Sequence, residues 1–167
     1  MRTIPRRQHP VNESGPDSRV RTAAGDAFSG LIVRLFRLNG ILAAEGETLA
    51  RPAGQTTARW QVLAAIEDSP MTVAQIARTL GLARQSVQRV ADALEEAGLV
   101  VYDDNPRHRR ARLVRLTEKG NRTLATIQGA QRPWANEIGA AVGERNLQQA
   151  IAQLDRVLNV LATRRSR

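Results

Sequence analysis

The chain has 167 residues, of which 25 are basic and 16 acidic, and its net charge of +9 favours an anionic partner: nucleic acid, a membrane surface or an acidic protein. It contains no cysteine, which excludes disulfides, thiolate metal sites and cysteine nucleophiles, and its only imidazoles, His9 and His108, are too far apart in sequence to predict a histidine-rich metal site. Aromatic residues make up 3% of the chain, so we expect an aliphatic core, which favours helices over a sheet sandwich.

Residues 1–22 are polar and rich in Arg, Pro, Gly and Ser, and their lack of apolar periodicity predicts a disordered basic tail. Such a tail is either an arm that touches a DNA backbone or a solvated start of the chain. No apolar segment follows its arginines as in a secretory signal, and we expect no apolar run to approach the roughly 20 residues that span a membrane. The expected location is the cytoplasm.

Apolar residues at helical spacing, together with capping and breaking residues, define most of the remaining chain. They predict a short helix between Thr72 and Gly81, and further helices over residues 26–49, 57–67, 84–97, 117–142 and 144–163. Pro133 is expected to kink the helix that contains it. The short helix, a tight turn and the helix over 84–97 together predict a helix-turn-helix.

Two short β-type runs, residues 99–102 and 111–116, follow the helix-turn-helix and predict a hairpin, which we call the wing. The expected fold class is therefore mainly α (α+β): a winged helix-turn-helix with a two-stranded β wing. The last helix carries leucine and isoleucine at steps of four and three, which is typical of a helix–helix seam. That seam fits either an intramolecular bundle or a dimer, and the small aromatic content and the already complete winged unit favour a dimer.

The helix over 84–97 buries one apolar face and carries a polar, basic face at its beginning. That face consists of Arg84, Gln85, Ser86, Gln88 and Arg89, while the acidic residues of the helix lie further along. Arginine and glutamine pair with base edges in the major groove, where acidic side chains would be repelled by phosphate. An ordinary solvated face has the same polar character, so this helix alone leaves the question open.

The wing holds five arginines within nine residues and no acid: Arg107, Arg109, Arg110, Arg112 and Arg115, with His108 among them. Arginines at this density repel one another unless an anion lies near. Arg107 at the hairpin tip suits a narrow minor groove. A basic hairpin alone would also suit RNA or an acidic protein, but combined with a helix-turn-helix it favours duplex DNA.

Three stretches of sequence carry a resemblance to a known family: residues 72–82, residues 86–100, and residues 106–120, which end in Leu-Thr-Glu-Lys-Gly. In these stretches the chain resembles the MarR family of bacterial transcriptional regulators, and the similarity extends over about residues 26–163. The resemblance implies a homodimer whose N- and C-terminal helices flank two winged lobes and form the dimerisation base. The implied segments are a tail (1–22), a dimerisation helix with its linker (23–55), a DNA-binding lobe (56–120) and C-terminal dimerisation helices (121–167).

The resemblance also assigns roles to individual residues. It implies DNA contacts by the polar face of the helix over 84–97 and by Arg107 and Arg110 of the wing. Further candidate DNA contacts are Thr72, at the start of the preceding helix, and Arg109, Arg112 and His108 of the wing, although His108 stands where the family commonly has Asp. An ion pair between Asp92 and Arg110 would hold the wing to the helix. The implied dimer interface contains Phe28, Leu31, Leu35, Leu147, Ile151, Leu154, Leu158 and Leu161. Some family members bind small aromatic or phenolic effectors, for which the candidate lining residues are Phe36, Trp60, Tyr102 and Trp134, although each also fits plain core packing.

The sequence therefore predicts a sequence-specific regulator that binds double-stranded DNA at a pseudo-palindromic operator, and most simply a homodimeric repressor released by a small effector. The alternative is a basic winged-helix module that binds RNA or an acidic protein without regulating genes. No nucleophile–base pair, glycine-rich phosphate loop or metal constellation is present in the sequence, so we expect neither an enzyme nor a cofactor.

Overall fold

The structure is a computed structural model that describes residues 20–106, 108 and 110–165. It divides into two compact units, Met1–Leu42 and Ala43–Arg167, each of which is described by itself. Helix α1 (Ala23–Ala50) begins in the first unit and ends in the second, and it starts three residues earlier than the periodicity predicts. The tail expected over residues 1–22 lies, up to residue 19, outside the described residues.

Helix α1 and the short 3-10 helix η1 (Arg51–Ala53) form a stretch of 31 residues that is long and apolar enough to cross a membrane, by length and composition alone. The expectation that no apolar run reaches such a length is therefore wrong. The same stretch carries Arg34 and Arg37 near its middle. Each arginine at the centre of a span costs roughly 2.5–3.5 kcal/mol, so this composition does not favour a membrane location.

The end of α1 is joined closely to helix α2 (Thr57–Ala65), which ends two residues before its predicted end. The Thr57 backbone N–H donates to Glu47 Oε1 at 2.8 Å, and Thr57 Oγ1 donates to the Ala43 carbonyl at 3.0 Å. A Cβ at Gly46 would lie 2.7 Å from Thr57 Oγ1, so the absence of a side chain permits this approach. The first backbone N–H groups of a helix have no partner within the helix, so the hydrogen bond to Glu47 fixes the start of α2 against the end of α1.

The predicted helix-turn-helix is confirmed as α3 (Val73–Leu80) and α4 (Arg84–Glu96). Thr72 and Gln75 form a capping box at the start of α3, which satisfies two backbone donors at once. Gly81 ends α3 with φ +66°, a left-handed conformation that glycine adopts without steric cost. These local signals explain why the sequence predicts both helix boundaries well.

The sheet has three antiparallel strands in the order β1-β3-β2, whereas the sequence predicts two. Strands β2 (Val100–Asp103) and β3 (Leu113–Leu116) form the wing, with Tyr102 opposite Val114. Strand β1 (Met71–Thr72) pairs with the other edge of β3. A strand of two residues has no periodicity of its own, and it exists only because β3 offers an unpaired edge.

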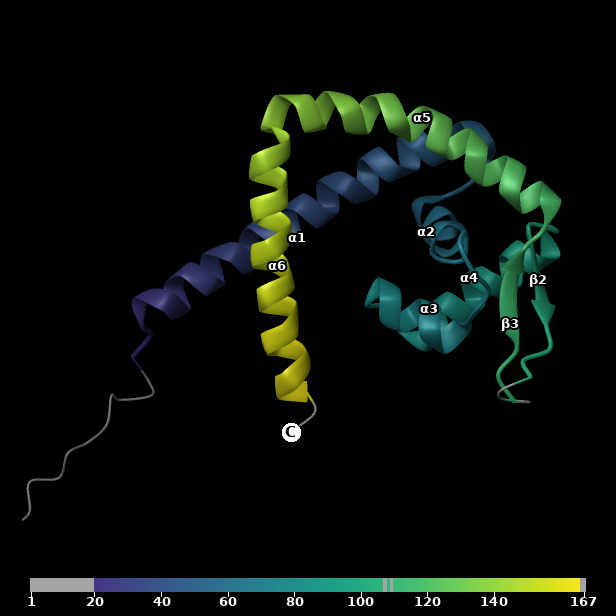
Figure 1. Cartoon of the computed structure of the whole chain (residues 1–167), viewed down its shortest axis with the longest axis horizontal. Helices are drawn as coiled ribbons and strands as arrows, with labels where there is room; N and C mark the ends of the chain where they lie inside the picture. Colours follow the sequence, from purple (N-terminus) through teal and green to yellow (C-terminus); the bar gives the residue numbers. More distant parts are fainter. Residues whose placement is uncertain (1–19, 107, 109, 166–167) are drawn as a thin grey trace, which may run out of the picture. The chain divides into compact units, whose positions relative to one another are not determined.

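Helices α5 (Glu118–Val142) and α6 (Glu144–Arg165) complete the chain, with Thr117 as the N-cap of α5. Helix α5 runs without interruption through Pro133. In Figure 1 it leaves the wing and passes over α2, with which it is in contact. Gln128 Nε2 donates to both carboxylate oxygens of Glu67 at 2.8 Å, which ties α5 to the segment after α2.

The hydrophobic core lies between α2, α3, α4, the sheet and the first half of α5. Its most buried side chains belong to Val62, Leu63, Ile66, Ile76, Val87, Leu94, Leu99, Val100, Val114, Leu124 and Ile127. Within the described part of the chain no polar residue is fully buried. Helix α6 contributes no buried residue, and its apolar side chains are half-buried or exposed.

Candidate nucleic-acid interface

Helix α4 presents one face to the core and another to solvent. Val87, Ala91 and Leu94 are buried, while Arg84, Gln85 and Arg89 are exposed and Ser86 and Gln88 are half-buried. No acidic residue occurs in the first turn, where the positive end of the helix dipole adds to the charge of the arginines. The face predicted to read DNA is therefore free of core contacts and electropositive at its beginning.

Thr72 lies beside this face but already has local partners. Its Oγ1 accepts from the Gln75 backbone N–H at 3.3 Å and donates to Gln75 Oε1 at 2.9 Å. Its backbone forms part of β1, opposite Leu113. Thr72 thus positions the start of α3 through its side chain, and a DNA contact by this residue remains a prediction.

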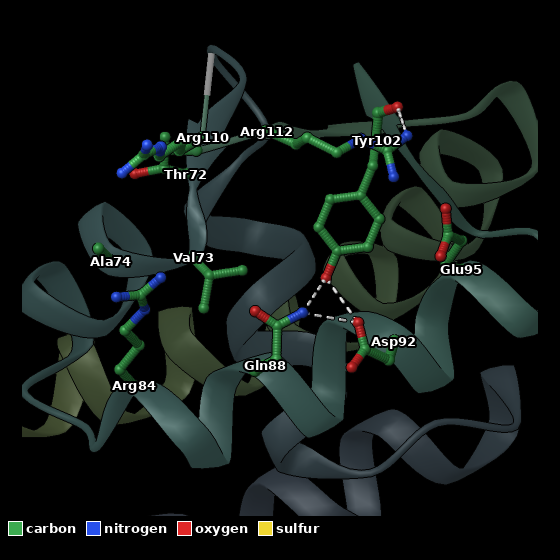
Figure 2. A pocket seen from close by; sticks show the side chains of 11 residues that line it. Thr72, Val73, Ala74, Arg84, Gln88, Asp92, Glu95, Tyr102, Arg110 and Arg112 are labelled. Carbon is green, nitrogen blue, oxygen red and sulfur yellow. Dashed lines mark hydrogen bonds between the residues drawn. The ribbon is translucent and has the colours of Figure 1, made fainter. Parts of the chain in front are cut away.

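Tyr102 connects the wing to helix α4 through three hydrogen bonds that form a closed triangle (Figure 2). Its hydroxyl donates to Asp92 Oδ1 at 2.8 Å, and Gln88 Nε2 donates to the Tyr102 hydroxyl at 2.8 Å and to Asp92 Oδ1 at 2.7 Å. Burial, and then the hydrogen bond to Asp92, raises the pKa of the Tyr102 phenol well above its usual value of 10.0. The hydroxyl therefore keeps its proton at physiological pH and remains a donor.

The expected ion pair between Asp92 and Arg110 is not present among the described residues. Asp92 is engaged by Gln88 and Tyr102, and although Arg110 lines the same cavity it forms no salt bridge with this carboxylate. The wing is held to the recognition helix as expected, but by a phenol and not by a guanidinium. A tyrosine on β2 reaches Asp92 because alternate residues of the strand face α4, which the sequence analysis did not consider.

The wing arginines differ in how they are held. Arg112 donates to the Tyr102 carbonyl, and its guanidinium carbon lies 5.1 Å from the centroid of the Tyr102 ring, a cation–π arrangement. Arg115 forms an ion pair with Asp103 of the neighbouring strand, at 2.6 Å from Nε to Oδ2. His108 and Arg110 are exposed, and the predicted contacts of Arg107 and Arg109 lie outside the described residues. The arginine-rich stretch itself holds no acid, but Arg115 is neutralised by Asp103, which lies across the hairpin and outside that stretch.

The Asp103–Arg115 pair predicts a pH dependence of wing stability. The hydrogen bond from Arg115 lowers the pKa of the Asp103 carboxyl below its usual value of 3.8, so the pair stabilises the hairpin fully above that pH and loses its effect as the pH falls below it. We expect Asp103→Asn to lower the melting temperature slightly at pH 7, and the difference to shrink as the pH falls below 3.8 and the carboxyl becomes protonated. Melting curves across this range test it. Asp104→Asn removes the same charge and is the control; an equal effect of both variants at pH 7 would contradict the prediction.

A cavity of about 280 Å³ lies between α3, α4 and the wing, and both polar and apolar residues line it. Its lining includes Thr72, Arg84, Gln88, Asp92, Tyr102, Arg110 and Arg112 (Figure 2). Residues expected to bind DNA from three separate elements are thus brought together around one hollow. The sequence predicts these elements, but their common cavity arises only from the tertiary structure.

The four aromatic residues considered for an effector site do not form one group. Tyr102 lines the cavity just described, which includes neither Trp60 nor Trp134. Trp60 packs against the core from α2, and Trp134 is half-buried on α5. Phe36 belongs to the first unit and is 74% exposed. The structure places Tyr102 beside the residues predicted to contact DNA, and an effector site at any of the four aromatic residues remains a prediction.

The residues expected at a dimer interface remain uncovered in the isolated chain. Ile151, Leu158 and Leu161 of α6 are 58%, 61% and 41% exposed, and Leu147 and Leu154 are half-buried. Phe28 is 39% exposed, and Leu31 and Leu35 are half-buried. An apolar stripe of this extent on a helix outside the core is typical of an interaction surface.

The chain is similar in sequence to a known family and to known proteins. A family model described as "MarR family" matches residues 53–111. An uncharacterized protein of Mycobacterium tuberculosis is 39% identical over 140 residues, which cover 84% of this chain and 98% of the relative. The transcriptional activatory protein BadR of Rhodopseudomonas palustris is 27% identical over 135 residues, covering 78% of this chain and 76% of BadR.

Solved structures share the fold. The transcriptional repressor CouR bound to a 23-mer DNA duplex is 26% identical, with a TM-score of 0.69, and the match covers 83% of this chain and 99% of that chain. CouR from Rhodococcus jostii RHA1 bound to p-coumaroyl-CoA is 23% identical, with a TM-score of 0.68 and coverage of 74% and 87%. The match to both structures extends well beyond the winged lobe, since it covers most of each chain.

Proposed function

The chain belongs to the MarR family of transcription regulators, and we propose that it is a cytoplasmic, homodimeric repressor that binds double-stranded DNA at a pseudo-palindromic operator. The observation that carries the proposal is the face of α4, where Arg84, Gln85 and Arg89 are exposed beside a basic wing. Helices of a helix-turn-helix read the major groove from their N-terminal residues, which is where these side chains lie. The wing arginines then contact the adjacent backbone and minor groove.

The dimer in this proposal is supported by the uncovered apolar side chains of α6. Two recognition helices related by a two-fold axis and about 34 Å apart would read half-sites one turn of DNA apart. We propose a DNA-binding role without catalysis, as in the family, whose members are regulators.

In this proposal a small effector releases the protein from its operator. CouR binds p-coumaroyl-CoA, an aromatic acyl thioester, and Trp60 on α2 is the residue of this chain that we assign to an aromatic or phenolic effector. An effector that binds one arrangement of the two lobes more tightly would shift the population away from the DNA-binding one. We propose that the protein represses transcription, whereas the relative BadR is named as an activatory protein.

The proposal predicts specific binding to duplex DNA from the region upstream of the protein's own gene. We expect preference over random competitor of roughly 10³-fold or more. Arg84→Ala should weaken this binding by roughly tenfold, because one good side-chain contact to a base edge is worth about 1–3 kcal/mol. Fluorescence anisotropy titrations with labelled duplexes measure both effects.

Arg122→Ala is the matched control, since it removes the same charge from an exposed position on α5. Arg122 forms an exposed ion pair with Glu118 of the same helix, and the loss of such a pair contributes little, so the affinity should stay within about twofold. Equal losses in both variants, or binding that falls with salt and shows no sequence preference, would favour the alternative of a general anion-binding module for RNA or an acidic protein.

A further inference from the structure

The hydrogen bonds at Gln88 determine which way its amide faces. The carboxylate of Asp92 can only accept hydrogen bonds, so the group of Gln88 that lies 2.7 Å from it must be the NH₂ end. Tyr102 uses its single hydroxyl proton toward Asp92 and therefore receives the second Gln88 hydrogen. Chemistry alone thus settles an orientation that is otherwise ambiguous for a glutamine side chain.

With both amide hydrogens directed to Tyr102 and Asp92, the Gln88 side chain offers a carbonyl oxygen and no donor to an incoming ligand. In Figure 2 this oxygen points away from Tyr102 and Asp92, on the side where Arg84 and Val73 lie. Gln88 is one helical turn after Arg84 on the face expected to enter the major groove. The half-buried side chain is held in place before any ligand arrives, so little rotamer freedom is lost on binding.

We propose that Tyr102 is a positioning residue for sequence recognition, which makes Gln88 an acceptor-only reader of one base in the operator. The inference rests on the proposed function and deepens it, since it names the determinant of one operator position. A free glutamine selects adenine through a bidentate pair, accepting from N6 and donating to N7. An acceptor-only glutamine selects any base with an exocyclic amine in the major groove, which means adenine or cytosine, and does not distinguish the two.

Removal of the Tyr102 hydroxyl should change this selectivity in one direction. Tyr102→Phe keeps the ring but frees one amide hydrogen of Gln88, which can then reach N7 of adenine. We expect the ratio of adenine to cytosine at the position read by Gln88 to rise by roughly fivefold or more. Asp92→Ala frees a hydrogen by removing the other acceptor and should move the ratio in the same direction.

The experiment is a binding-site selection from a library of duplexes randomised across a half-site, with the full chain and its variants as bait. Gln88→Ala first identifies the position, as the one at which base preference disappears. Tyr102→Phe combined with Gln88→Ala should match Gln88→Ala alone. Gln85→Ala, an exposed glutamine on the same turn, is the matched control and should leave the adenine-to-cytosine ratio at the Gln88 position unchanged.

The outcomes are distinguishable. A wild-type chain that enriches no sequence overturns the proposed function, and the inference with it. Enrichment by the wild type with an unchanged ratio in Tyr102→Phe and in Asp92→Ala overturns the inference alone. A purely structural role for Tyr102 would lower affinity for all sequences equally, so a uniform loss in both variants also overturns it. Melting temperatures of the variants confirm that each is folded during selection.

Discussion

Replacement of Gly120 by alanine is expected to unfold the winged lobe at moderate denaturant concentrations. A Cβ at this position would lie 2.0 Å from the Leu99 carbonyl oxygen and 3.1 Å from its carbon, and both atoms belong to the backbone. The oxygen cannot easily move, because it accepts from the Thr117 backbone N–H at 3.0 Å and from Thr117 Oγ1 at 3.1 Å. The first turn of α5 would have to separate from the start of the wing.

Overpacking of a well-packed site costs roughly 1–3 kcal/mol and occasionally more, and a clash with fixed backbone belongs to the upper end of that range. We therefore expect Gly120→Ala to lower the free energy of unfolding by about 3 kcal/mol, which is a large part of the roughly 5–15 kcal/mol of a typical domain. Urea denaturation followed by circular dichroism, at one fixed protein concentration, measures the loss.

Gly129→Ala in the same helix is the matched control. A Cβ at Gly129 meets nothing within 4 Å, so the substitution only replaces glycine by a better helix former. We expect a gain of up to about 1 kcal/mol. If both alanine variants had the same effect, the close approach of α5 to the wing would not be the reason for glycine at position 120.

Replacement of Leu158 by glutamate is expected to abolish the dimer. Leu158 lies on the apolar stripe of α6 and is 61% exposed in the isolated chain, so a charge there is tolerated by the monomer and costly only when a partner covers it. A monomer engages one half-site, and the loss of simultaneous binding should reduce operator affinity by roughly 100-fold or more. Analytical ultracentrifugation and DNA titrations test the two parts separately.

Gln149→Glu introduces the same charge on α6, at a position roughly opposite to Leu158 around the helix. This control should remain dimeric and bind DNA with nearly unchanged affinity. A Leu158→Glu chain that stayed dimeric would contradict the assignment of the α6 stripe to the interface. We expect the winged lobe to keep its melting temperature in both variants, because α6 contributes no buried side chain to the core.

Much of the fold follows from local signals in the sequence. Thr72 and Gly81 act within one turn of helix, so the limits of α3 could be predicted without knowledge of any distant contact. The same holds for Thr117 at the start of α5. Helix α1 is the exception, since with η1 it is long and apolar enough to cross a membrane by length and composition, contrary to the expectation from the sequence.

The candidate site depends more on tertiary structure. Sequence placed Arg84, Gln85 and Arg89 on an exposed face, because helical periodicity determines which residues share a face once the apolar ones are buried. It did not predict that Asp92 bonds to Tyr102 in place of Arg110, or that Asp103 neutralises Arg115. The first contact joins α4 to β2 over ten positions, and the second joins β2 to β3 over twelve positions across the hairpin, so neither partner can be read from a single segment of sequence.

By itself, then, the sequence determined the order of the elements, the basic character of the wing and the polar face of α4, all of which arise from interactions within a few residues. Only the tertiary structure decided the third strand, the α5 approach at Gly120 and the orientation of Gln88. The physical reason is the same in each case. A hydrogen bond or a steric contact acts over only about 3–4 Å, so its partners are known only after the chain has brought distant residues to that distance.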